Sequence, residues 1–307
     1  MSLALAADLF ALATLMLGSW TRINGAGLTC PDWPLCHGRL LPSLRDGTFW
    51  EWSHRLLAFS VAPLVIALAA VAWRQRHRSA FITPTLALIG ALFAVQVFLG
   101  AETVRLANAP FSVVLHWATA MALIASLSAM AVFAAASNAD PPSRHAVTPR
   151  SASILFVVTS VTAIVAFATM CVGAYVSSSG AGLACLSIPE CAGNVVVHTP
   201  GQFVQMLHRF AAAATLICAA GTLALAWAHG SSIRVRAAVG AGAALVCVQV
   251  MLGLLNVALR LPMILREAHA VNAALVFLTF FVGAAFALLD AAPVERTASI
   301  PRSAPSR

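Results

Sequence analysis

The sequence predicts an all-α integral membrane protein. We expect eight transmembrane helices, arranged as two tandem four-helix bundles that are related by a pseudo-twofold axis along the membrane normal. Three observations lead to this prediction: an apolar composition, eight apolar runs of membrane-spanning length, and a repeat that relates the two halves of the chain. Of the 307 residues, 61% are hydrophobic and only 9% are charged, which excludes an ordinary soluble domain.

Each apolar run is about as long as the hydrocarbon core of a bilayer requires, which is roughly 20 helical residues. Backbone amides find no water in lipid, so a run that crosses it must form a helix. The first run lacks the basic residues that begin a signal peptide, so we count it as a helix. In chain order the predicted helices cover residues 3–21, 53–73, 83–102, 112–136, 152–177, 204–228, 234–257 and 267–290.

The basic residues indicate how these helices are oriented. The net charge of +8 comes from arginines alone, because the chain has no lysine. One side of the predicted membrane holds Arg74, Arg76, Arg78, Arg144, Arg150, Arg234, Arg236, Arg296, Arg302 and Arg307, and the other holds Arg22, Arg39, Arg45, Arg105, Arg260 and Arg266. The positive-inside rule places the first set and both termini in the cytoplasm of a bacterium, and the opposite loops in the periplasm. The charge therefore reports membrane topology and does not indicate a nucleic-acid partner.

The two halves of the chain repeat each other. The stretch GSWTRINGAGLTCPDWPLC (18–36) matches GAYVSSSGAGLACLSIPEC (173–191), and VQVFLG (95–100) matches VQVMLG (248–253). A unit of four helices returns to the side where it began, so the two copies share one orientation, as in parallel-repeat transporters. We divide the chain into an N-terminal half (1–136), a cytoplasmic linker (137–151), a C-terminal half (152–290) and a cytoplasmic tail (291–307) that we expect to be disordered.

Four of the nine histidines occupy matched positions near the starts of the even-numbered helices: His54, His116, His208 and His269. The predicted topology puts all four at one depth, near the periplasmic face. Hydrogen bonds between helices are one explanation. The repetition of these histidines at matched positions instead favours binding of a metal ion. Ionisable groups inside a membrane usually mark a site, and neutral imidazole is the commonest metal ligand.

Two histidines per half suit the two axial positions of a haem iron. Zinc would usually recruit three or four clustered ligands. We therefore predict two haem sites, one formed by His54 and His116 and the other by His208 and His269.

Arginines near these histidines are candidate partners for the haem propionates, since a guanidinium pairs with a carboxylate in a fork geometry. Arg55 and Arg209 directly follow their histidines, and other arginines lie at the outer ends of helices: Arg22, Arg105, Arg260 and Arg266. From these we select Arg55 and Arg105 in the first half and Arg209 and Arg266 in the second. The alternative is that these side chains extend to the membrane interface without binding a ligand.

Two cysteine pairs repeat with the same spacing, Cys30 with Cys36 and Cys185 with Cys191. The periplasm is oxidising, so we predict the disulfides Cys30–Cys36 and Cys185–Cys191. A metal site is the alternative, but no histidine is matched beside these cysteines.

The halves differ at one position that bears on chemistry. Glu51 lies three residues before His54 and projects from the same helix face, whereas Gln205 occupies the matching place in the second half. A carboxylate near hydrocarbon can exchange protons. The alternative role is stabilisation of a helix N-terminus. Glu51 is our candidate for the chemistry, which we place in the first half.

Over nearly its whole length the chain resembles the haem A synthase family. The resemblance rests on the repeated GAGL loops with their cysteines and on EWSHR, LHWATA, QMLHR and EAHAVNA. It implies an enzyme that oxidises a methyl group of haem O to a formyl group, through an alcohol and then a gem-diol that loses water. The implied partners are haem O, haem O synthase, the assembly of terminal oxidases and an electron acceptor that the sequence does not identify.

The resemblance also implies a role for each half. His54 and His116 would hold the iron of the substrate haem O, while His208 and His269 would ligate a haem B cofactor. Glu51 takes the catalytic position. Cys30 and Cys36 match a pair implicated in activity, and the second pair, Cys185 and Cys191, is expected to be structural.

Two other functions are consistent with parts of the pattern. A di-haem electron-transfer cytochrome of the quinol oxidoreductase type would need the four histidines but not the asymmetry at Glu51. A transporter built from parallel repeats would be expected to have broken helices near mid-membrane, whereas the polar residues here cluster at one face.

Overall fold

The structure is a computed structural model that describes residues 2–137, 147–191, 193 and 197–292. Most of the predicted linker (138–146) and of the predicted tail (293–307) lies outside the described residues, as do the arginines assigned to the cytoplasmic side at 144, 296, 302 and 307. The described part of the chain is all-helical, apart from an isolated bridge between Cys36 and Arg39.

Eight helices are long and apolar enough to span a membrane, which confirms the predicted number of spans. They are α1 (Ser2–Ile23), α2 (Thr48–Arg74), α3 (Ile82–Arg105), α4 (Pro110–Ala136), α5 (Pro149–Ser178), α6 (Pro200–Ala228), α7 (Ile233–Ala258) and α8 (Met263–Ala291). Two short 3₁₀ turns, Arg76–Arg78 and Ala181–Leu183, follow α2 and α5.

Local chemistry sets the helix starts. Helix α6 begins with a capping box, in which the Thr199 side chain accepts from the Gln202 amide and the Gln202 side chain accepts from the Thr199 amide. Helix α2 begins at Thr48, five residues before the predicted start at 53, directly after Gly47 with φ +84°. Glu51 therefore lies inside the first turn of α2.

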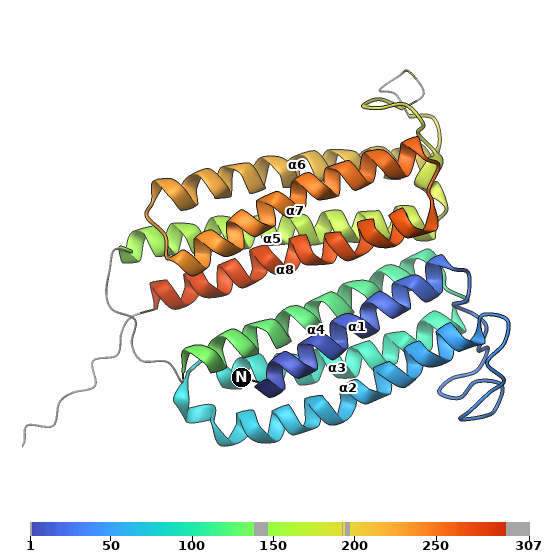
Figure 1. Ribbon diagram of the computed structural model, residues 1–307, viewed down its shortest axis with the longest axis horizontal. Helices are drawn as coiled ribbons and strands as arrows, with labels where there is room; N and C mark the ends of the chain where they lie inside the picture. The colour runs from blue at the N-terminus through green and yellow to red at the C-terminus, as the bar shows by residue number, and fades with distance from the viewer. Residues whose placement is uncertain (1, 138–146, 192, 194–196, 293–307) are drawn as a thin grey trace, which may run out of the picture.

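The helices form two bundles that lie side by side, α1–α4 and α5–α8 (Figure 1). Helices α4 and α8 are the most buried; Met121, Leu127 and Phe280 are inaccessible to solvent. The halves meet where α4 packs against α5 and α8 and where α1 packs against α8. The loops that follow α1 and α5 lie at one end of both bundles, which we call the disulfide end.

One contact between the halves joins repeat-equivalent residues. The Arg22 guanidinium donates to Ser177 Oγ at 3.1 Å, and these positions are 155 residues apart, the same spacing that relates Cys30 to Cys185. Contacts between equivalent residues are what a twofold axis produces. The pseudo-twofold axis and the orientation of the helices in the membrane remain predictions.

Candidate functional site

The four predicted ligand histidines lie within the first three turns of α2, α4, α6 and α8, toward the disulfide end. Each ring packs against a glycine near the end of the preceding helix. A Cβ atom would lie 2.6 Å from the His54 ring at Gly18 and 2.7 Å from the His208 ring at Gly173. Gly100 and Gly253 face the other two rings, at 3.3 and 3.4 Å. Only glycine at 18 and 173 leaves room for the rings, a role that the sequence comparison did not assign to them.

His54 and His208 are oriented in the same way. The Nδ1 atom of His54 lies 3.0 Å from the carbonyl oxygen of Thr14, and that of His208 lies 3.2 Å from the carbonyl oxygen of Thr169. A carbonyl only accepts, so Nδ1 carries the proton and Nε2 keeps its lone pair. This is the arrangement that fixes the tautomer of a metal-binding histidine.

His116 and His269 are oriented by glutamines. The side-chain amide of Gln96 lies 3.4 Å from His116 Nε2, and that of Gln249 lies 3.1 Å from His269 Nε2. The Nδ1 atoms of both histidines are buried and have no partner among the described residues. Sequence reasoning missed these glutamines, although they stand in the matched VQVFLG and VQVMLG stretches.

The two glutamines differ in what holds them. Gln249 accepts a hydrogen bond from the Asn272 side chain at 2.7 Å and donates to the His269 carbonyl at 3.0 Å. The Oε1 atom of Gln96 is buried and has no partner within the described part of the chain. Thr119 occupies the first-half position that matches Asn272, so the fixing amide is absent there.

The His208–His269 pair is spaced so that both rings could bind one metal ion. The ring centres of His208 and His269 are 6.3 Å apart, with their planes at 73°. Two imidazoles that share one metal ion, each with a metal–nitrogen distance of about 2 Å, have ring centres about 6 Å apart. Across the described residues, no three of His, Cys, Asp or Glu gather into a metal site. Two imidazoles per half suit haem, because the porphyrin supplies the remaining ligands.

Glu51 is buried beneath the first disulfide loop. One of its oxygens pairs with the Arg55 guanidinium at 2.6 Å, and the other accepts from the Cys30 amide at 2.8 Å and the Thr29 hydroxyl at 3.1 Å. Its side chain is only 5% exposed. The structure thus brings together the three residues predicted to be catalytic, since Cys30 is disulfide-bonded to Cys36.

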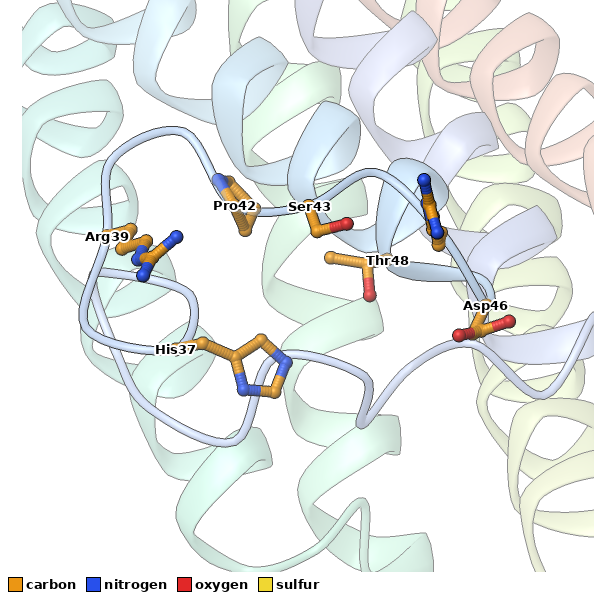
Figure 2. Close-up of a pocket in the computed structure, with 7 residues that line it drawn as sticks. His37, Arg39, Pro42, Ser43, Asp46 and Thr48 are labelled. Atoms are coloured by element: carbon orange, nitrogen blue, oxygen red, sulfur yellow. The ribbon is translucent and has the colours of Figure 1, made fainter.

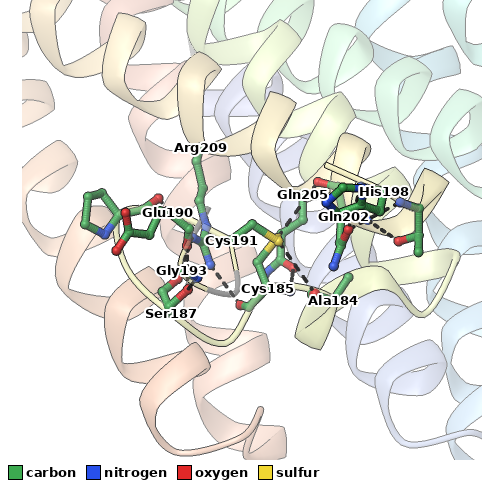
Figure 3. Close-up of a disulfide and its surroundings, with 12 residues drawn as sticks. Ala184, Cys185, Ser187, Glu190, Cys191, Gly193, His198, Gln202, Gln205 and Arg209 are labelled. Atoms are coloured by element: carbon green, nitrogen blue, oxygen red, sulfur yellow. Dashed lines mark hydrogen bonds between the residues drawn. A yellow bond between two sulfur atoms is a disulfide. The ribbon is translucent and has the colours of Figure 1, made fainter. Parts of the chain in front are cut away.

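Gln205 takes the same place in the second half. Its Oε1 atom accepts from the Cys185 amide at 2.6 Å (Figure 3). Its Nε2 atom donates to the Gly182 carbonyl at 2.9 Å. A neutral amide therefore makes the same backbone contact as the carboxylate does in the first half. The loop geometry does not require a negative charge at this position.

Both predicted disulfides are present. Cys30–Cys36 and Cys185–Cys191 each have a Cα–Cα distance of 4.6 Å. In the first loop, the amides of His37 and Gly38 donate to the Asp32 carboxylate. The bond from Gly38, followed by that from His37, holds the pKa of Asp32 below its usual value.

The arginines next to the ligand histidines support these loops. Arg55 donates to the carbonyls of Cys30, Asp32 and Leu35. Arg209 donates to those of Cys185, Ser187, Pro189 and Glu190, as Figure 3 shows in part. Both guanidinium groups are thus committed to loop carbonyls, and the structure offers no support for their predicted binding of propionates.

The other two predicted propionate partners differ from each other. Arg105 pairs with Glu102 at 2.7 Å, and its side chain is 69% exposed. Arg266 lines a cavity between the halves together with Arg22, which sequence reasoning did not select.

A second cavity lies in the first disulfide loop. Its volume is about 340 Å³, and it is open to solvent (Figure 2). It is lined by His37, Arg39, Pro42, Ser43, Arg45, Asp46 and Thr48, none of which is a predicted site residue.

Comparisons with known proteins identify the family of the chain. Residues 43–281 match the family model described as "COX15-CtaA: Cytochrome oxidase assembly protein". The chain is similar to proteins named "Heme A synthase" from Shouchella clausii (33% identical over 66% of this chain and 67% of the relative) and Bacillus licheniformis (31%, over 66% and 67%). A protein of the same name from Shewanella oneidensis is 26% identical over 88% of this chain and 91% of its own length.

Proposed function

The chain belongs to the COX15-CtaA family of cytochrome oxidase assembly proteins, and on that basis we propose that it makes haem A from haem O. It is a multi-pass membrane protein and an enzyme of the oxidoreductase type. The observation that carries the proposal is the pair of repeat-matched histidine sites that differ in the group beneath the disulfide, Glu51 in one and Gln205 in the other.

The reaction converts a methyl group into a formyl group. It proceeds by two oxidations, each of which removes two electrons. The first gives the alcohol, and the second gives a gem-diol that loses water to leave the aldehyde. In each oxidation the oxygen of a water molecule replaces a hydrogen on the carbon, and two electrons and two protons are released. The site therefore needs a proton acceptor as well as an electron acceptor.

The first half is the proposed substrate site. His54 and His116 hold the iron of haem O, and Glu51 accepts protons released at the methyl carbon. Support for Glu51 comes from its burial and from its place in the first turn of α2, three residues before His54. To act as a base, Glu51 must give up its contact with Arg55 when it takes a proton. Arg55 then still has the loop carbonyls as hydrogen-bond partners.

The first disulfide is proposed to take part in the same chemistry. A disulfide that takes up two electrons and two protons becomes two thiols, which matches the electrons and protons released in one oxidation. The contact between the Cys30 amide and Glu51 supports this proposal, because it places the carboxylate next to the disulfide.

The second half is the proposed cofactor site, with haem B held by His208 and His269. When bound, haem B would supply one-electron transfer. Residues of this half orient the two histidines. The Thr169 carbonyl fixes the tautomer of His208, and the Gln249 side chain donates to the His269 carbonyl. We place both haem sites toward the periplasm and both termini in the cytoplasm. The proposed partners are haem O synthase, which supplies the substrate, and terminal oxidase assembly, which consumes the product.

The test is to express the chain in cells that lack their own synthase and to identify the extracted haems by chromatography. We expect haem A to appear, with haem B and haem O in the purified protein. A protein that holds two equivalent, non-exchanging haems and forms no haem A would instead indicate a di-haem electron-transfer cytochrome.

A further inference from the structure

A polar cavity opens between the two bundles at the disulfide end. Its volume is about 290 Å³. The first half contributes the end of α1, part of the first loop and the start of α4, and the second half contributes the end of α5 and the start of α8. The lining residues are Arg22, Gly25, Gly27, Leu28, Asn108, Val113, Ser177, Ser178 and Arg266.

The charges around this cavity do not balance. The Arg22 guanidinium is within electrostatic range of Arg266, a like charge, and of Glu267, an opposite charge. Glu267 also accepts a hydrogen bond from Ser19 at 2.8 Å. Two cations therefore face one carboxylate in a partly buried position, where like charges repel more strongly than in water. An anion in the cavity would offset the excess positive charge.

The cavity lies close to both predicted haem sites. Val113 is three residues before His116 on α4, and Arg266 is three residues before His269 on α8. Residues three apart on a helix share a face, and three residues rise about 4.5 Å along the axis. The cavity is therefore about one helical turn from a ligand histidine of each half.

We propose that this cavity binds the carboxylate groups of the haems held by His116 and His269, with Arg22 and Arg266 as their cationic partners. The identity of the haems rests on the proposed function, but the recognition of carboxylates does not. The fork of a guanidinium group matches a carboxylate in geometry and charge. The other predicted arginines are committed elsewhere, Arg55 and Arg209 to loop carbonyls and Arg105 to Glu102.

The two arginines of this cavity are not matched by the repeat, although the glycines Gly25 and Gly27 beside them are. Arg22 corresponds to Ser177 in the second half, and Arg266 corresponds to Val113 in the first. Each half thus supplies one arginine from a different helix, and the two meet at the boundary between the bundles. One cavity with two cations thus offers a partner to a carboxylate of each haem.

The test uses the full-length chain, produced in a haem-deficient host and purified in detergent. It is titrated with iron mesoporphyrin IX and, separately, with the dimethyl ester of the same porphyrin, which lacks the carboxylate charges. We expect the wild-type chain to prefer the free acid by about ten- to hundredfold in dissociation constant, the usual effect of hydrogen bonds to charged groups. Arg22→Gln and Arg266→Gln should each lose most of this preference.

The matched control is Arg260→Gln, which removes an exposed cation at the same end of the molecule without touching the cavity and should keep the preference. If Arg22→Gln binds neither porphyrin, the preference is measured with Arg22→Lys instead. A reduced preference for the free acid supports the site, because lysine keeps the positive charge but lacks the fork geometry of the guanidinium group. An unchanged preference in the arginine variants overturns it.

An anionic phospholipid is the other source of a matching anion. Mass spectrometry of co-purified lipids separates the two. Loss of bound anionic lipid from Arg22→Gln, together with an unchanged preference for the free acid, would assign the cavity to a lipid phosphate and overturn the proposal. None of these measurements requires turnover. A wild-type chain that makes no haem A would contradict the proposed function alone.

Discussion

The two halves hold their disulfide loops in the same way but place a different group beneath them. In both, an arginine on the helix after the loop donates to the loop carbonyls, and a side chain of the same helix accepts from the amide of the first cysteine. That side chain is a carboxylate in the first half and an amide in the second. Because a carboxylate and an amide make the same contact with the loop, folding does not require the carboxylate of Glu51. Its presence is better explained by a chemical role.

The histidine sites differ in a similar way. The ring packing on glycine and the bonds of His54 and His208 to a carbonyl are common to both halves. The glutamine opposite the second histidine is fixed by Asn272 in the second half and lacks that partner in the first. The shared features suit iron ligation. The differences suit a fixed cofactor in one half and an exchanging substrate in the other.

Exchanging the two groups beneath the disulfides is the strongest way to break this comparison. Glu51→Gln should lower haem A formation by about 10²–10⁴-fold, the usual contribution of a general base. Haem content should stay nearly unchanged, because Gln205 already makes the equivalent contact with Cys185. The measurement is haem A per unit of protein in cells that lack their own synthase.

The reciprocal change, Gln205→Glu, is the control. It gives the second half the carboxylate of the first and should leave haem A formation close to wild type. Near-normal haem A formation in Glu51→Gln would show that Glu51 only stabilises the helix N-terminus. Loss of that charge costs only about 0.3–1 kcal/mol of stability.

Removing single ligands should separate the two haems. We expect His269→Ala to lower the haem B content of the purified protein to less than about a tenth, since even the outer-shell partners of metal ligands contribute 10–100-fold in affinity. His116→Ala should deplete haem O and spare haem B. Chromatography of the extracted haems measures both. Equal loss of both haems from either variant would show that the sites do not bind independently.

The sequence predicted most of the fold, because hydropathy alone determines where a chain crosses a membrane. The helix starts were less accurate. Helix α2 begins five residues early at a glycine with positive φ, and Pro110, Pro149 and Pro200 extend three others by a few residues. The division into halves, linker and tail stays a prediction.

The histidines and cysteines of the site could be found because the repeat marked them. The repeat also marked the glutamines, and Arg22 was among the arginines at the outer helix ends, but the roles of these residues depend on which helix faces meet. The Gln96 side chain reaches His116 on α4, and the Arg22 side chain reaches Ser177 on α5. Arg55 and Arg209 were assigned to propionates from their position beside the histidines. Sequence spacing did not reveal the loop carbonyls that compete for them.

Removing each disulfide in turn sharpens the comparison. Cys30→Ser with Cys36→Ser, and Cys185→Ser with Cys191→Ser, should each cost roughly 2–3 kcal/mol of stability, since each bridge closes a loop of the same length. Only the first pair should also lower haem A formation. Thermal unfolding in detergent and haem A yield are the two measurements. Equal losses of haem A from both double variants would indicate that the first disulfide is structural only.

The smallest predicted effect concerns the two glutamines, and its sign differs between the halves. The Gln96 amide has His116 Nε2 as its one hydrogen-bond partner among the described residues, and iron needs the lone pair of that nitrogen. When haem binds, Gln96 is left buried without a partner, which weakens binding. Gln96→Leu removes that penalty, so haem O should leave the first half about two- to tenfold more slowly.

Gln249 keeps Asn272 and the His269 carbonyl as partners when iron takes Nε2, so it supports the bound state. Gln249→Leu should therefore release haem B about two- to tenfold faster, the opposite change from the matched substitution. Transfer of haem to excess apomyoglobin gives both rates, and chromatography of the haem that remains identifies which half has emptied. If both leucine variants shifted their rates in the same direction, the glutamines would be packing residues. The difference between a resident and an exchanging haem would then have to come from elsewhere in the two halves.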